Sequence, residues 1–279
     1  MNGDISVDYV LFKLNETFQV KDIAKELVTA KDITEAKLIK SERDFDRIPI
    51  KIDGKITTYY DSNSNSEKQI DPGEIISDST GILETLSYLS KKDFYFVLSG
   101  NDITHIVHYS DLNNQLVLTP LYTQISYCEI EIRNFARENC INNTENGIEN
   151  FLSNINQNIG GDFKIDVKRA VNQFNTKLKN QTQTDLFDEL YLNDELILLR
   201  VLFKVKLNSD QFKKFNDYID LSDNSIRSYN ELRTNIMHSK PEIIKQKSDI
   251  SKWLDFMNFC QKAINVINGR VCFNDRSSE

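Results

Sequence analysis

Glycine, proline, cysteine and histidine are scarce in this chain of 279 residues. Nine Gly and four Pro argue against a loop-rich β sandwich and favour long helices. The four cysteines form no C-x-x-C pair and share their half of the chain with one histidine, so we expect no metal site. We expect them to be buried thiols in a reducing cytosol. They are Cys128, Cys140, Cys260 and Cys272.

Long apolar runs and an excess of positive charge are also missing. No uninterrupted apolar run approaches the roughly 18 residues of a membrane span. Asp4 and Asp8 interrupt the apolar residues that an N-terminal signal peptide would need. We therefore expect a cytoplasmic protein with no membrane partner. The 42 acidic and 34 basic residues disfavour a large sequence-independent DNA binder, although a short RNA could still bind at one local cationic site.

The N-terminal part alternates short helical and short β-rich stretches. Residues 47–52 and 55–60 flank Asp53-Gly54, and Asp-Gly between two alternating runs is the strongest short-range signal for a β hairpin. The polar stretch 62–66 predicts a surface loop.

The same pattern then returns. Ser79 is predicted to cap a helix that carries an apolar stripe over residues 82–89. Residues 94–98 predict a buried strand, Gly100-Asn101 a turn, and residues 103–108 the returning strand. Each half thus ends in a hairpin, which indicates an internal repeat.

Each hairpin is followed by a short polar motif. The first copy is Thr58-Tyr-Tyr-Asp61 and the second is His108-Tyr-Ser-Asp111, fifty residues later. This arrangement resembles the tandem CBS module, in which two β-α-β-β-α repeats form a cleft for an adenosine nucleotide. The resemblance covers roughly residues 8–116 and implies a nucleotide-sensing domain over residues 1–116.

The resemblance implies that Asp61 and Asp111 accept hydrogen bonds from the ribose hydroxyls, because an ionised carboxylate only accepts. It implies that Thr58 meets a phosphate. His108 stands in the threonine's place and could supply a cation there if it is protonated. The alternative is that an Asp after a strand simply caps the next helix.

From Leu121 onward the apolar period is helical. Leu121, Ile125, Cys128, Ile132 and Phe135 follow steps of four and three, which predicts an amphipathic helix of about five turns. Further helices are expected over residues 144–157, 165–180, 185–205, 209–220, 223–239 and 248–268, with the recurring Asn of the first weakening that prediction. The predicted fold class is therefore an α+β N-terminal CBS pair followed by an all-α bundle.

One stretch of this bundle, Arg233-Thr-Asn-Ile-Met-His238 followed by Pro241, resembles the R-x(4–6)-H motif of the HEPN superfamily. The resemblance spans roughly residues 117–279. It implies a HEPN-like all-helical domain in which two protomers pool their motifs to cleave RNA without a metal. The expected protein is thus a nucleotide-regulated endoribonuclease or RNase-like toxin with an RNA substrate, an adenine nucleotide effector and no cofactor required for catalysis.

Supporting residues are expected around the motif: Thr234 and Asn235 directly after the arginine, and Glu129 and Arg133 on an earlier helix. A histidine suits proton transfer from a ribose 2′-hydroxyl near neutral pH, and a forked arginine suits the charge that develops on the phosphoryl oxygens. On a regular helix, however, two positions five residues apart are separated by about 140°.

Two alternatives stay open for the helical half. Arg233 could pair with a carboxylate such as Glu231 or Asp255, with His238 a cation at a helix C-terminus. The protein would then be a non-catalytic nucleotide sensor whose helical domain only dimerises or docks a partner. A basic helix face could line an RNA path or simply be solvated. Its residues are Lys164, Lys168, Arg169, Lys177 and Lys179.

Overall fold

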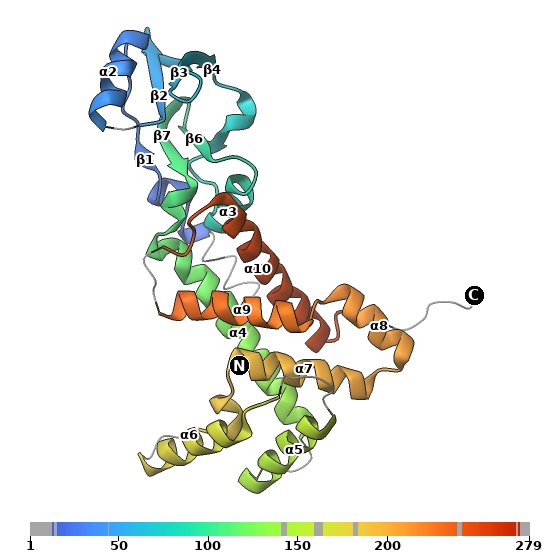
Figure 1. Ribbon diagram of the computed structural model, residues 1–279. Coiled ribbons are helices and arrows are strands. Elements are labelled where there is room, and N and C mark those ends of the chain that lie inside the picture. The colour runs from blue at the N-terminus through green and yellow to red at the C-terminus, as the bar shows by residue number, and fades with distance from the viewer. Residues whose placement is uncertain are drawn as a thin grey trace, which may run out of the picture. The chain divides into compact units, whose positions relative to one another are not determined.

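The computed structural model describes residues 13, 16–43, 45–140, 144–158, 164–180, 184–238, 242–271 and 273. They form two compact units. The sheet unit comprises the described residues from 13 to 120 and from 242 to 254, and the helical unit those from 121 to 238 and from 255 to 273. The protein is therefore mixed α+β, with strands in its N-terminal part and helices after them (Figure 1).

The division differs in two respects from the domains expected from the sequence. The sequence predicts a boundary after residue 116 with everything later in the helical domain, whereas residues 117–120 and 242–254 belong to the sheet unit. The expected helix stop at Pro241 and the fourth cysteine, Cys272, lie outside the described residues.

The sheet unit contains seven strands and two short helices among its described residues. These are β1 (Lys25–Glu26), α2 (Ile33–Arg43), β2 (Arg47–Ile52), β3 (Lys55–Asp61), β4 (Ser66–Gln69), β5 (Ile75–Ser77), α3 (Ile82–Leu89), β6 (Phe94–Ser99) and β7 (Asp102–His108). Short 3-10 helices are η1 (Val20–Asp22), η2 (Pro72–Glu74) and η3 (Tyr109–Leu112). One sheet has the order β2-β3-β4 and the other the order β1-β7-β6-β5.

The helical unit follows. Its described helices are α5 (Glu145–Asn158), α6 (Val167–Lys179), η4 (Leu186–Glu189), α7 (Leu192–Lys206), α8 (Ser209–Tyr218) and α9 (Asp223–Met237). Two further helices, α4 (Gln115–Asn139) and α10 (Lys247–Ile267), have residues in both units. The periodicity predicted most of these helices to within a few residues, and the Asn-rich segment is helical as well. The single helix expected over residues 185–205 is instead η4 followed by α7, and α4 begins at Gln115, before the expected Leu121.

The two hairpins of the sheet unit share the same strand register. The register shifts after Ile50 in β2–β3 and after Val97 in β6–β7, which are 47 residues apart. Ala30 bridges to Ile50 in parallel, as Ile76 pairs in parallel with Val97. The internal repeat expected from the sequence is therefore present as a β-α-β-β unit.

The register of this repeat corrects the alignment of the two polar motifs. Asp61 pairs with Arg47 at the end of the first hairpin, and His108 pairs with Phe94 at the same place in the second. The structural counterpart of Asp61 is therefore His108. Asp111 lies three residues beyond it, in η3.

The local turn chemistry agrees with the sequence at one site and differs at two. Asp53 and Gly54 have φ of 49° and 80°, the positive values that a type I′ hairpin turn requires. The prediction that Ser79 caps α3 is wrong, because Gly81 is the N-cap and the Ser79 hydroxyl contacts that of Ser77 at 2.8 Å. The predicted loop at 62–66 ends one residue early, because β4 begins at Ser66.

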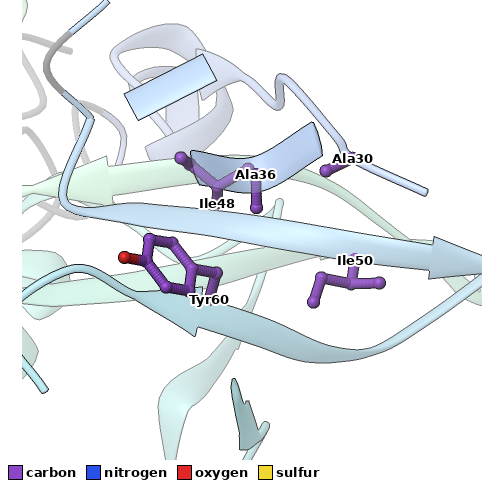
Figure 2. Close-up of a cluster of buried hydrophobic side chains, with 5 residues drawn as sticks. All are labelled: Ala30, Ala36, Ile48, Ile50 and Tyr60. Atoms are coloured by element: carbon purple, nitrogen blue, oxygen red, sulfur yellow. The ribbon is translucent and has the colours of Figure 1, made fainter. Parts of the chain in front are cut away.

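Strand β3 holds two apolar clusters because neighbouring residues of a strand face opposite ways. Tyr60 packs with Ile48 and Ile50 of β2, and with Ala30 and Ala36 (Figure 2). Tyr59 turns to the other side and contacts the rings of the second sheet, with centroids 5.9 Å from Phe94 and 5.4 Å from Phe96.

In the helical unit, the stripe predicted on α4 is buried at all five positions. Helix α7 is buried on nearly every side, from Leu192 to Phe203. On α9, Ile226, Tyr229, Leu232 and Ile236 are buried, and the Tyr229 ring stacks on Phe256 at 4.8 Å. No helix in the described ranges combines the length and the apolar composition needed to cross a membrane.

Candidate functional site

A cavity of about 770 Å³ opens in the helical unit, and we call it the helical cavity. Ligand pockets of proteins range from roughly 300 to 1,000 Å³, so one nucleotide would fit. It brings together three residues singled out from the sequence, Glu129, Arg133 and Arg233, with part of the basic face of α6. Its lining is Glu129, Arg133, Asp166, Lys168, Arg169, Asn172, Gln173, Thr176, Lys177, Asp188, Glu189, Leu190, Tyr191 and Arg233.

Four ion pairs organise the helical cavity, and in each the cation is the more exposed partner. The four carboxylate side chains are 8% exposed or less, whereas the cations are between 18% and 48% exposed. The pairs are Arg233–Glu129 (2.9 Å), Arg133–Glu195 (3.1 Å), Lys177–Glu189 (2.8 Å) and Arg169–Asp194. In these four pairs a ligand meets the cation first, while the lining as a whole holds five cations and four carboxylates, of which Asp166 and Asp188 are exposed.

The local sequence explains why the carboxylates are buried and the cations are more exposed. Arg133 follows Glu129 by one helical turn on α4, beside the buried stripe, and Glu195 lies in the first turn of the buried helix α7. Burial raises the pKa of Glu195 well above its usual value, and the charge of Glu129 raises it further while Arg133 opposes the change. Burial likewise raises the pKa of Asp194, against hydrogen bonds from the Tyr191 and Asp166 amides and the charge of Arg169.

The two predicted catalytic residues lie on α9 but do not line the same cavity. Arg233 donates from Nε to Oε1 of Glu129, not to Glu231 or Asp255. His238 is the exposed C-cap of α9, and its backbone N–H donates to the carbonyl of Thr234. Since α9 is regular up to Met237, the separation of about 140° around the helix persists.

The supporting residues divide in the same way. Glu129 and Arg133 lie at the helical cavity with Arg233, whereas Thr234 and Asn235 are not part of its lining. The Thr234 hydroxyl donates to the carbonyl of Asn230 at 2.7 Å, an ordinary bond within the helix. The Asn235 Oδ1 is buried and has no hydrogen-bond partner in the described part of the chain.

Sequence reasoning missed Tyr191 and Gln173. The guanidinium of Arg169 lies over the Tyr191 ring, 3.5 Å from its centroid, and Gln173 Nε2 donates to the tyrosine hydroxyl at 3.2 Å. The hydrogen bond from Gln173 lowers the pKa of Tyr191, burial opposes it, and Arg169 lowers it further. No spacing in the sequence connects Tyr191 with α6, so only the fold shows this contact.

The sheet unit has a smaller cavity of about 360 Å³, the sheet cavity. Of the four predicted nucleotide-binding residues, His108 and Asp111 line it, whereas Thr58 and Asp61 do not. Residues that the sequence did not indicate, including Lys25, Arg47 and Asn63, complete the lining.

The predicted ribose acceptors already have protein partners. Asp111 pairs with Lys25 at 2.7 Å and accepts from the His108 amide at 2.8 Å, as the N3 residue of a capping box whose N-cap is His108 and not Asp111. Asp61 pairs with Arg47 at 2.8 Å and with Lys68. The nucleotide-binding role of both aspartates stays a prediction.

The other two predicted residues differ in their surroundings. Burial lowers the pKa of His108, although the nearby charges of Asp111 and Asp93 raise it, so its neutral form is favoured. That weakens the expectation of a cation beside a phosphate at this position. The Thr58 hydroxyl is buried, with no hydrogen-bond partner in the described part of the chain.

No model of a known protein family matches this chain, and neither does any curated protein or solved structure with which it was compared. Within the described ranges, no three His, Cys, Asp or Glu side chains gather so as to hold a metal ion. The two resemblances therefore rest on the sequence motifs.

The raised pKa of Glu195 predicts how stability changes with pH. Because its folded pKa exceeds the ordinary value of 4.5, the folded protein holds this proton more tightly. The stability that the protonated Glu195 contributes is complete below its ordinary pKa and is lost as the pH rises through the pKa of the folded protein. We expect urea unfolding at about pH 5 and about pH 8 to show a larger loss for wild type than for Glu195→Gln. Equal losses in the two proteins would contradict the raised pKa.

Proposed function

We propose that this protein is a nucleotide-regulated endoribonuclease of the HEPN type, which cuts RNA without a metal and acts as a homodimer. The observation that carries the proposal is the pairing of Arg233 with Glu129 in the helical cavity, on the helix that ends at exposed His238. The exposed cations of the cavity lining, Lys168 above all, provide a local site for a phosphodiester.

The proposed reaction is an internal transesterification. His238 takes the proton of a ribose 2′-hydroxyl, the O2′–P bond forms, and the P–O5′ bond breaks. The leaving 5′-oxygen takes a proton from the imidazolium of the second copy's matching histidine, which leaves a 2′,3′-cyclic phosphate and a 5′-hydroxyl. Arg233 stabilises the charge on the phosphoryl oxygens with its forked donors.

The homodimer is part of this proposal. Within one chain His238 does not line the helical cavity, while Arg233 does. A second copy that brings its own motif to the same place would complete the site, because the proposed reaction needs the histidines of both copies at one phosphodiester.

The same ion pairs also support a second candidate function. Each arginine that lines the helical cavity already pairs with a carboxylate, so Arg233 also has a structural role. The protein would then be a non-catalytic nucleotide sensor whose helical unit dimerises or docks a partner.

Catalysis is tested by single substitutions in an assay on mixed RNA with and without EDTA. His238→Ala should lower the rate by about 100- to 10,000-fold, since general acid–base groups contribute that much. Arg233→Lys keeps a positive charge beside Glu129 but loses the fork, and should lower the rate by about 100-fold or more. Lys213→Ala, an exposed change on α8, is the control.

Three outcomes decide between the proposals. His238→Ala that cuts as fast as wild type removes that residue from the mechanism. Cleavage that EDTA abolishes and magnesium restores would overturn the metal-free reaction. Wild-type protein that cuts no RNA favours the non-catalytic sensor.

Assembly is tested by light scattering on the full chain. Because the composite site needs two copies, we expect twice the chain mass of 32.4 kDa at micromolar concentration. A mass equal to that of one chain at the concentration used in the cleavage assay would contradict the shared site.

Nucleotide regulation is tested by calorimetry with adenine nucleotides. Asp111→Ala should abolish binding, because its carboxylate lines the sheet cavity, while the exposed Asp102→Ala should leave binding unchanged. Bound nucleotide should change the cleavage rate by roughly five- to 150-fold, the usual range of coupling between sites. Asp61→Ala is a poorer probe because it also breaks a buried ion pair. If no adenine nucleotide binds, the sheet unit has no sensing role.

A further inference from the structure

Tyr191 brings an exposed aromatic ring to the helical cavity. The residue is 48% exposed and lines the cavity. The guanidinium of Arg169 lies over one face of the ring, 3.5 Å from its centroid, so stacking would use the opposite face. An exposed tyrosine held in this way can receive a flat partner, because every nucleobase has a π face of its own.

The ring is also fixed in place. Gln173 holds the hydroxyl at 3.2 Å, and Arg169 is itself held by Asp194, by Gln173 Oε1 at 3.0 Å and by the carbonyl of Glu189 at 3.1 Å. A side chain ordered before binding loses little conformational entropy when a ligand stacks on it. The arrangement therefore favours stacking more than a free surface tyrosine would.

Free donors lie on the same wall. Lys168 and Asn172 are one turn apart on α6, exposed, and part of the cavity lining. In the described part of the chain, neither side chain has an ion pair or a hydrogen bond. Lys177 pairs with Glu189, but its side chain is still 48% exposed. An ammonium group and an amide N–H₂ are suitable partners for a phosphate and for a sugar or base edge.

We propose that the helical cavity seats one nucleotide of single-stranded RNA, with its base stacked on Tyr191 and its phosphate at Lys168. A base must be unstacked from its neighbours to meet a protein ring, which selects single strands over duplexes. The inference rests on the proposed function in that it takes RNA as the substrate. It adds the nucleotide-binding position in the cavity, here called the seat, which Tyr191 and Lys168 form.

The test uses full-length protein carrying His238→Ala, so that RNA stays intact, and a short fluorescein-labelled oligouridylate. Fluorescence anisotropy should show that adding Tyr191→Ala weakens binding by roughly five- to 150-fold, the usual effect of removing one base-stacking ring. With Tyr191→Phe added instead, the affinity should stay within a few-fold of that of the His238→Ala protein (the parent), because the aromatic ring remains. Tyr122→Ala is the matched control, since Tyr122 is 43% exposed and does not line the cavity.

The phosphate contact has its own readout. Lys168→Ala should reduce the slope of log affinity against log salt by about 0.7, the value of one phosphate contact on a single strand. Lys213→Ala on α8 should leave the slope unchanged. Uridine monophosphate, the matching DNA and a duplex RNA serve as competitors, and each should compete more weakly than the unlabelled oligouridylate.

The outcomes separate this inference from the proposed function. If wild type cuts no RNA while the parent binds it through Tyr191 and Lys168, the nuclease proposal fails and the seat stands. If wild type cuts RNA but Tyr191→Ala binds as tightly as the parent, the seat is overturned and the nuclease stands. Loss of binding in Tyr191→Phe equal to that in Tyr191→Ala would overturn stacking, and no binding by the parent would overturn the seat. If uridine monophosphate competes as well as the unlabelled oligouridylate, the proposal that the ligand is single-stranded RNA is overturned.

Discussion

A buried carboxyl group must either pair with a cation or hold its proton, and the helical unit depends on this constraint. An unpaired charge in an apolar interior costs far more than a fold can tolerate, so each acid fixes the position of a base. Glu129, Glu195 and Asp194 are buried beside apolar helix faces, and Arg233, Arg133 and Arg169 lie above them. The acids of these pairs face inward and the bases outward, so exposed cations reach the cavity although Asp166 and Asp188 add exposed carboxylates to its lining.

The same constraint explains a residue of the sheet unit that the sequence assigned to a ligand. Asp61 is buried at the end of β3, where Arg47 of β2 and Lys68 of β4 both reach its carboxylate. The three strands of this sheet are thus connected through one acid, and no nucleotide is needed to explain it. Asp111 differs, because it lies at the sheet cavity with one lysine partner, and it is the better place to look for a bound ribose.

The sequence predicted most of the elements because their signals are local. The helical period of α4 and the Asp53-Gly54 turn each depend on neighbouring residues. Strand β4 was missed because all of its residues are polar and exposed. The partner of Arg233 could not be chosen, because Glu129 is 104 residues away along the chain while Glu231 and Asp255 are nearer. Tyr191 was missed for the same reason, since its contacts with α6 exist only after folding.

In the proposed mechanism, helix α9 would link substrate binding to assembly. Arg233 lines the helical cavity while His238 lies at the exposed end of the helix, so one chain alone would offer the arginine without the pair of histidines that the reaction needs. An RNA seated on Tyr191 would meet Arg233 of the same chain and need a histidine from a second copy. Binding RNA and pairing of the copies would then favour one another, because a ligand that contacts both copies stabilises the pair by mass action. In such an arrangement a single copy holds RNA without cutting it, and cleavage begins only where two copies meet.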